Sequence, residues 1–361
     1  MTTKRYLPPS ALHPFLDGLP DTVSKRILGK SLNTLPVQLL TLGQGSCKIL
    51  MWSQMHGNES TSTRALLDFI PWFLSTAQKQ YQKTFTLSII LQLNPDGANA
   101  YTRLNAAGVD LNRDAMNLTQ PESHILHNIY HEIKPDYCLN LHGQRTLFSA
   151  GKMGKTASLS FLAPSADPER SVTPSRKKAM QLIVAMKREL EQELPGQIGR
   201  YDDTFNPNCV GDKFTQLGTP TILFEAGHVP NDYQREITRK HLFKCFKTLL
   251  NSILSNNFEY STKEYFEIPE NAKDFADIII SGIAIEAKGS VHKNQEVAIR
   301  YKEQLEGGEV RFIPVMEKYG LKLPLNAHKR LVLPKNKVDK TLLFEKGETI
   351  QNKELNIFCS I

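Results

Sequence analysis

Residues 47–70, CKILMWSQMHGNESTSTRALLDFI, contain a predicted strand, a short loop and a predicted helix, and this strand–loop–helix unit is the basis of the expected fold. The apolar run at 47–52 has the length and composition of a strand, and the short loop after it contains Gly57. From about Ser60 the pattern predicts an amphipathic helix. We expect Pro71 to kink or end this helix, because a proline ring clashes with the carbonyl group four residues earlier.

The same alternation of strands and helices extends to about residue 255. Strand-like runs are present at 37–42, 85–93, 137–143 and 219–227, and helical patterns at 122–134, 174–194 and 231–254. We also expect a short helix around Asp21–Leu28, irregular chain at 144–175, a loop at 199–214, and Asn231 or Asp232 as the cap of the last helix. This order predicts an α/β layer architecture with a largely parallel sheet.

The composition changes near residue 256. The stretch SNNFEYSTKEYFEIPEN has the character of a linker, and short strand-like segments follow it, among them ADIIISGIAI, EVRFIPV, KRLVLP, TLLFEK and ELNIFCSI. We therefore predict two domains: an α/β domain at 1–258 and a small, mainly β domain at 259–361. The sequence contains no internal repeat.

Composition excludes several classes of protein. The net charge is +7, but the one dense basic cluster, Arg176-Lys177-Lys178, opens a helical segment that we interpret as a solvated face, so we expect no nucleic-acid partner. No apolar run approaches the roughly 20 residues of a membrane span, and the N-terminus lacks a secretory apolar core. The five cysteines are scattered without a C-x-x-C pair, which argues against disulfides and a thiolate zinc site. We expect a cytoplasmic protein with no membrane contact.

Polar residues follow several of the predicted strands. His56, Glu59, His142 and Glu225 fall at or just past the carboxyl end of a strand, and the loop 94–114 follows another. In parallel sheets ligands bind at this edge. We expect these features to meet there.

Two histidines and one glutamate suggest a metal. His56-x-x-Glu59 can present two ligands to one ion, and His142 would add a third from another strand. Two His and a carboxylate, with a fourth position open for water, are a catalytic zinc set. H-x-x-E alone is a weak signal, and His124, His127 and His131 form another histidine group that we interpret as a helix surface. Phosphate-binding loops and a serine-hydrolase elbow are missing from the sequence.

The motifs in order are H-x-x-E, NPDG, R-x-N-x-x-G-V-D-L-N-R, a histidine ending a strand, and T-I-L-F-E. This series resembles the zinc carboxypeptidase family, the carboxypeptidase A-like metallopeptidases, over about residues 35–255. The resemblance implies a three-layer α/β/α sandwich with a mixed eight-stranded sheet, and a metallocarboxypeptidase that cleaves a C-terminal peptide bond with one Zn²⁺. Asp114 and Ala115 follow the N-R pair where the family often has Asn and an aromatic residue, which indicates a divergent, bacterial-type branch.

The resemblance also implies roles at the metal. His56, Glu59 and His142 match the zinc ligands of the family. Asp110, two positions before Asn112, matches the carboxylate that orients the first histidine.

Further roles concern the substrate. Glu225 matches the general base, and Arg103 the cation that polarises the scissile carbonyl and holds the oxyanion. Asn112 and Arg113 match the residues that bind the C-terminal carboxylate. Tyr201 is the candidate for the tyrosine that closes over the substrate. Arg145 adds a cation either near this site or on the surface.

Two other functions remain open from the sequence. One is an amidohydrolase for N-acyl amino acids, similar to aspartoacylase and the succinylglutamate desuccinylases, which share these motifs and carry a C-terminal β domain. The other is a metal-binding module without catalysis, against which Glu225 argues, since a binder needs no base. In each case the partner would be a peptide or acyl-amino acid with a free carboxylate. The sequence does not specify side-chain preference, the role of the C-terminal domain or the oligomeric state.

Overall fold

The computed structural model describes residues 4–332, 341–343 and 346–349 of the chain. Its larger part is built on an eight-stranded sheet. In spatial order the strands are β1 (Ser24–Lys30), β2 (Pro36–Leu42), β4 (Phe85–Ile90), β3 (Cys47–Ser53), β5 (Tyr137–Gly143), β9 (Thr221–Ala226), β7 (Leu159–Leu162) and β8 (Ile198–Arg200). Four of the seven pairings are parallel, and β4, β3, β5 and β9 form one continuous parallel block. The predicted mixed, largely parallel sheet is confirmed.

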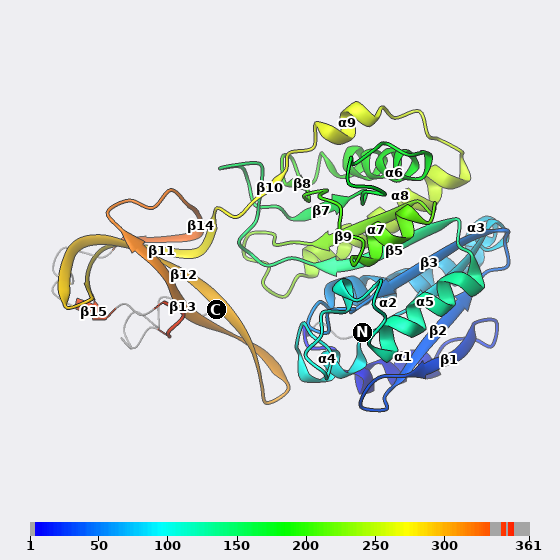
Figure 1. Cartoon of the computed structure of the whole chain (residues 1–361), viewed down its shortest axis with the longest axis horizontal. Coiled ribbons are helices and arrows are strands. Elements are labelled where there is room, and N and C mark those ends of the chain that lie inside the picture. Colours follow the sequence, from blue (N-terminus) through cyan, green and yellow to red (C-terminus); the bar gives the residue numbers. More distant parts are fainter. Residues whose placement is uncertain (1–3, 333–340, 344–345, 350–361) are drawn as a thin grey trace.

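Helices cover both faces of the sheet (Figure 1). Three long helices, α2 (Thr61–Leu74), α6 (Pro174–Leu190) and α8 (Glu236–Leu254), pack on one face in the larger core. On the other face, α5 (Pro121–Ile133) and α7 (Val210–Gln216) enclose the second core. This confirms the α/β/α sandwich. The shorter elements are η1 (Pro9–Leu12), α1 (His13–Asp17), η2 (Thr76–Gln78), α3 (Lys79–Thr84), α4 (Pro95–Ala100), η3 (Leu111–Arg113), β6 (Ser149–Ala150), α9 (Thr262–Phe266) and β10 (Asn271–Ala272).

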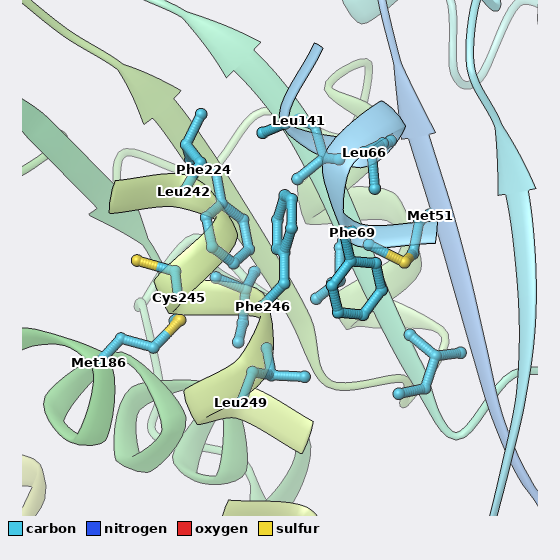
Figure 2. Packing of buried hydrophobic residues seen from close by; sticks show 14 of the residues in the cluster. Met51, Leu66, Phe69, Leu141, Met186, Phe224, Leu242, Cys245, Phe246 and Leu249 are labelled. Carbon is cyan, nitrogen blue, oxygen red and sulfur yellow. The ribbon is translucent and has the colours of Figure 1, made fainter. Parts of the chain in front are cut away.

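Aromatic side chains join α2, α8 and β9 in the larger core (Figure 2). The ring of Phe246 lies 5.5 Å from that of Phe69 and 5.7 Å from that of Phe224, centroid to centroid, and all three side chains are buried. Burying one such side chain contributes roughly 1.5–3 kcal/mol to stability. This packing fixes the strands whose carboxyl ends carry the polar residues.

Several local predictions were wrong. The helix expected at 21–28 is replaced by the edge strand β1, whose backbone pairs with β2 and whose polar residues face solvent. The segment expected to be irregular at 144–175 contains β7, and β8 extends into the expected loop at 199–214; both strands are too short for a clear periodic pattern. Helix α7 begins in the same loop, where the sequence also allows a helical turn. Helix α2 continues through Pro71 to Leu74. Helix α8 begins only at Glu236, yet the Asp232 carboxylate accepts hydrogen bonds from its first backbone N–H groups, as a cap does.

Three more observations bear on the composition. Arg176 is fully buried and pairs with Asp203 at 2.5 Å, so the basic cluster is not one solvated face. Cys47, Cys138, Cys209 and Cys245 are free thiols, and Cys359 lies outside the described residues. Among the described helices, none combines the length and apolarity that crossing a bilayer requires.

The C-terminal part is a separate five-stranded sheet (Figure 1). Its strands are β11 (Phe275–Ala287), β12 (Ser290–Glu306), β13 (Glu309–Gly320), β14 (Asn326–Val332) and β15 (Thr341–Leu343). The predicted β character is confirmed, although β12 was not foreseen; the segment 354–361 lies outside the described residues. The boundary at 258/259 stays a prediction. Tyr265 of α9, which follows that boundary, is buried against the larger part, and its hydroxyl accepts a hydrogen bond from Ala163 N–H.

Buried polar contacts join the two parts. The Glu303 carboxylate of β12 accepts hydrogen bonds from the Arg5 guanidinium at 2.8 Å and the Tyr101 hydroxyl at 2.6 Å. The Asp277 carboxylate of β11 accepts from the Tyr233 hydroxyl at 3.0 Å and the Thr146 hydroxyl at 3.1 Å. The C-terminal sheet is therefore held against the larger part at two carboxylates.

Removing the Glu303 carboxylate should destabilise the protein. In Glu303→Ala the buried Arg5 guanidinium loses its charge partner, and breaking a buried pair on one side costs about 3 kcal/mol. We expect that loss in urea unfolding. The control is Glu309→Ala, which removes the exposed pair with Lys4 and should leave the unfolding free energy within error of the wild type. Equal stability of the two variants would contradict the importance of this contact.

Candidate metal centre and cleft

His56, Glu59 and His142 come together at the carboxyl end of the sheet. His56 and Glu59 lie in the loop from β3 to α2, and His142 is the penultimate residue of β5. Strands β3 and β5 pair in parallel, so their carboxyl ends lie side by side. One ligand atom from each residue lies within 4.8 Å of the others, and no other such group occurs among the residues that the structure describes. The predicted convergence of these three is confirmed.

The geometry of this group fits a zinc ion. The two Nδ1 atoms of His56 and His142 are 3.0 Å apart, and the Glu59 carboxylate oxygens lie 3.0 Å and 3.1 Å from them. Two imidazole nitrogens that close repel through their lone pairs unless a proton or a cation lies between them. Zinc bonds of about 2.0–2.1 Å in tetrahedral geometry separate two ligand atoms by roughly 3.3 Å, close to the distances here. Three protein donors leave the fourth position for water.

The protonation states of Glu59 and His142 suit a metal. Burial would lower the pKa of His56, but the charge of Glu59 and the hydrogen bonds to Asp110 and Glu59 raise the pKa to about 9, so His56 must lose a proton when a metal binds. Burial would raise the pKa of Glu59, but His56 and hydrogen bonds from both histidines hold it below its usual range, so the carboxylate is ionised. Burial lowers the pKa of His142, which favours the neutral imidazole. A carboxylate and a neutral imidazole are the ligand forms that bind zinc.

Asp110 fixes the orientation of His56. Its Oδ1 atom lies 2.9 Å from His56 Nε2 and accepts a hydrogen bond from Asn112 N–H, also at 2.9 Å. This contact turns His56 Nδ1 toward the other donors, as outer carboxylates do at metal sites. The buried Nε2 of His142 has no hydrogen-bond partner among the described residues.

The NPDG segment supports the histidine loop. It forms the start of α4, where Asn94 caps the helix through a bond from Gly97 N–H at 2.8 Å. The backbones at Gly57 and Gly97 approach so closely that a Cβ on Gly57 would lie 1.9 Å from the Gly97 carbonyl carbon. Glycine at position 57 is therefore required for the loop to lie here.

Glu225 lies beside the metal group. It is paired in register with His142 between β9 and β5, and its buried Oε2 has no partner among the described residues. Burial raises its pKa well above the ordinary value, and the charge of Glu59 adds to that effect. Such a carboxyl readily holds a proton.

The remaining predicted residues line the same cleft. Arg103 donates to Asp110 at 3.0 Å and to Glu59 at 3.3 Å. The Asn112 side-chain oxygen accepts from Val210 N–H at 3.0 Å, which leaves its NH₂ group as a donor, and Arg113 donates to the Asn112 carbonyl at 2.7 Å. Tyr201 is near enough to Glu225 that their charges interact, although burial is the main cause of its raised pKa. The cleft has a volume of about 1230 Å³.

Other histidines lie elsewhere. His124, His127 and His131 are on α5 and do not line the cleft. His228 is buried between Tyr233 and His328, with ring centroids 4.6 Å and 4.4 Å away.

Sequence reasoning left the role of the C-terminal domain open and did not identify the residues by which its sheet contributes to the cleft. Arg300, Tyr301, Lys302 and Phe312 line it, although they lie far from the motifs in the sequence. No local pattern signals such a contact.

Comparison with known proteins agrees with this geometry. A family model described as zinc carboxypeptidase matches residues 11–206, just over half of the chain. No curated protein sequence matches. The metallo-carboxypeptidase of Burkholderia cenocepacia has a similar structure, with a TM-score of 0.56 and 20% identity over 70% of this chain and 71% of that one. The metallo-carboxypeptidase of Pseudomonas aeruginosa, solved in complex with (2-guanidinoethylmercapto)succinic acid, matches with a TM-score of 0.54 and 17% identity. The match covers 69% of this chain and 70% of that one. Carboxypeptidase A of Helicoverpa armigera matches with a TM-score of 0.55 and 14% identity, over 72% of this chain and 76% of that one.

Loss of the Asp110 carboxylate should weaken zinc binding. Asp110→Asn removes the charged acceptor that orients His56, and removal of such a partner lowers metal affinity about 10–100-fold. Competition with a chromophoric chelator measures this affinity. Asp21→Asn, an exposed carboxylate far from the group, is the matched control. Unchanged affinity in Asp110→Asn would show that His56 does not depend on this contact.

Proposed function

The chain belongs to the zinc carboxypeptidase family, and on that premise we propose that it removes the C-terminal residue of a peptide. It is a zinc metallopeptidase, and its cofactor is Zn²⁺. The observation that carries the proposal is the placement of Glu225 beside the His56–Glu59–His142 group, in one cleft with two arginines.

The chain's own residues then have separable tasks. His56, Glu59 and His142 hold the metal, and Asp110 orients His56. A bound zinc ion lowers the pKa of its water to about 7. Glu225 would take a proton from the water that adds to the scissile carbonyl and pass it to the amine that leaves when the C–N bond breaks. The burial that raises the pKa of Glu225 supports this role, because it makes the carboxylate a better proton acceptor.

Substrate contacts complete the proposal. Arg103, next to Glu59, stabilises the oxyanion that develops at the scissile carbonyl. Asn112 and Arg113 bind the terminal carboxylate through the amide NH₂ group and the guanidinium. Tyr201, whose ring lies 5.5 Å from that of Phe148, closes over the substrate.

The size of the cleft favours a peptide over an N-acyl amino acid. Small-molecule sites occupy about 300–1,000 Å³, and this cleft exceeds that range at about 1230 Å³. Blocked peptides and N-acyl amino acids, assayed side by side with the zinc-loaded protein, separate the two activities. We expect hydrolysis of the peptides; cleavage of the N-acyl amino acids alone would establish the amidohydrolase instead.

Glu225→Gln is the direct test of the mechanism. The amide keeps the shape of the side chain but cannot accept the proton, so kcat should fall about 10²–10⁴-fold while zinc content stays at one ion. Peptide hydrolysis and metal analysis measure the two quantities. Glu189→Gln, on the exposed face of α6, serves as the control. Full activity in Glu225→Gln would remove this residue from the role of base.

A further inference from the structure

The cleft is built from both sheets, and its walls beyond the metal group are rich in cations. Arg145 lies in the loop after β5, Lys273 lies between β10 and β11, and Arg300 and Lys302 lie on β12. These four side chains take no part in the proposed chemistry. They are candidates for contacts with a longer stretch of substrate.

Arg145 has no ionic partner of its own among the described residues. It is exposed and forms no hydrogen bond or ion pair with any residue in the described part of the chain. Arg300 lies near it and lowers its pKa, an effect second only to that of desolvation, whereas Glu317 acts in the opposite direction. Glu317 is the ion-pair partner of Arg300, at 3.3 Å. Two guanidinium groups thus share one carboxylate of the protein.

The backbone that presents these two arginines is held rigidly. The carbonyl of Gln144, before Arg145, accepts from the buried Arg235 at 3.0 Å. Asp277 accepts from the hydroxyl of Thr146 at 3.1 Å and from the N–H of Tyr301 at 2.8 Å. One buried carboxylate therefore anchors the residue after each arginine, which fixes the two cations relative to each other across the junction of the two sheets.

Three other carboxylates that line the cleft accept hydrogen bonds from neighbouring residues of the protein. Glu303 is paired with Arg5. Asp202 accepts from Thr204, and Asp212, whose pKa burial raises to about 7, accepts from Asn206 N–H. The residues that line the cleft include eight Arg or Lys and five Asp or Glu side chains, so the cleft as a whole carries an excess of positive charge.

The position of Arg145 determines which part of a substrate it meets. Arg145 lies in the loop after β5, and the next residue, Thr146, donates to Asp277 of the C-terminal sheet. Arg113 follows Asn112, whose side-chain oxygen accepts from Val210 N–H at the start of α7. On the proposed function Arg113 binds the terminal carboxylate beside α7, and we infer that the rest of the peptide runs past the metal group toward the C-terminal sheet, where Arg145 lies. A peptide bound by Arg113 extends its amino-terminal part toward Arg145.

We propose that Arg145 and Arg300 bind an acidic side chain of the substrate on the amino-terminal side of the scissile bond. The guanidinium fork suits a carboxylate, which would offset the repulsion between the two cations. The enzyme then prefers peptides with Glu or Asp in that part, and the C-terminal sheet is a specificity element. This inference rests on the carboxypeptidase activity proposed above.

Matched peptides test this preference. The two are N-blocked and identical except for Glu or Gln at the two residues before the scissile bond. For the wild-type zinc enzyme we expect kcat/KM to be about tenfold higher with Glu, the lower end for hydrogen bonds to a charged group. The difference should lie mainly in KM, because the contact forms equally in the ground and transition states, and it should shrink as ionic strength rises.

Variants identify the residues responsible. Arg145→Gln and Arg300→Gln should each bring the Glu/Gln ratio toward one, and Arg145→Lys should keep part of it, since the charge remains without the fork. Lys177→Gln, an exposed cation on α6, should keep the wild-type ratio. A ratio that Arg145→Gln leaves intact overturns the inference. A wild-type enzyme that cleaves both peptides equally overturns it too but leaves the proposed function standing, whereas cleavage of neither peptide refutes both.

Discussion

The parallel pairing of β3 with β5 is the constraint on which the metal group depends. Ser53 lies opposite Leu141 in this register, so the chain leaving β3 reaches His142 at the end of its neighbour. A shift by one residue would turn the His142 side chain to the other face of the sheet. The buried residues of α2, α8 and β9 hold this register, and the chemistry at the edge is thus positioned by apolar packing below it.

Segments that contribute no metal ligand also hold the three ligand residues in place. The loop after β4 supplies Asp110 to His56, and its first turn lies directly against Gly57. The C-terminal sheet supplies Asp277 and Glu303, which secure the backbone around Arg145 and the N-terminal segment at Arg5. Ligand geometry in this protein therefore depends on segments that contribute no ligand, as is usual at sites that need a fixed arrangement.

Sequence alone predicted the features that have a local signal. Long apolar strands such as 47–52 and 137–143, and helices with clear periodicity, appear where expected, and the order of His56, Glu59 and His142 along parallel strands was enough to place them at one edge. The edge strand β1 and the short strands β7 and β8 were missed, because backbone pairing rather than side-chain pattern defines them. The cleft wall formed by Arg300 and Phe312 was missed because it depends on how two sheets meet.

The contact between Arg5 and Glu303 joins residues 298 positions apart. Arg5 also offers its carbonyl to the Ser60 hydroxyl, beside the loop that carries His56 and Glu59. Ribosomes make the N-terminal end first, and domains fold as they emerge. The metal ligands lie between His56 and His142, whereas the part of the cleft that the C-terminal sheet lines begins only at Arg300. The ribosome therefore makes all three metal ligands well before the residues with which the C-terminal sheet completes the cleft.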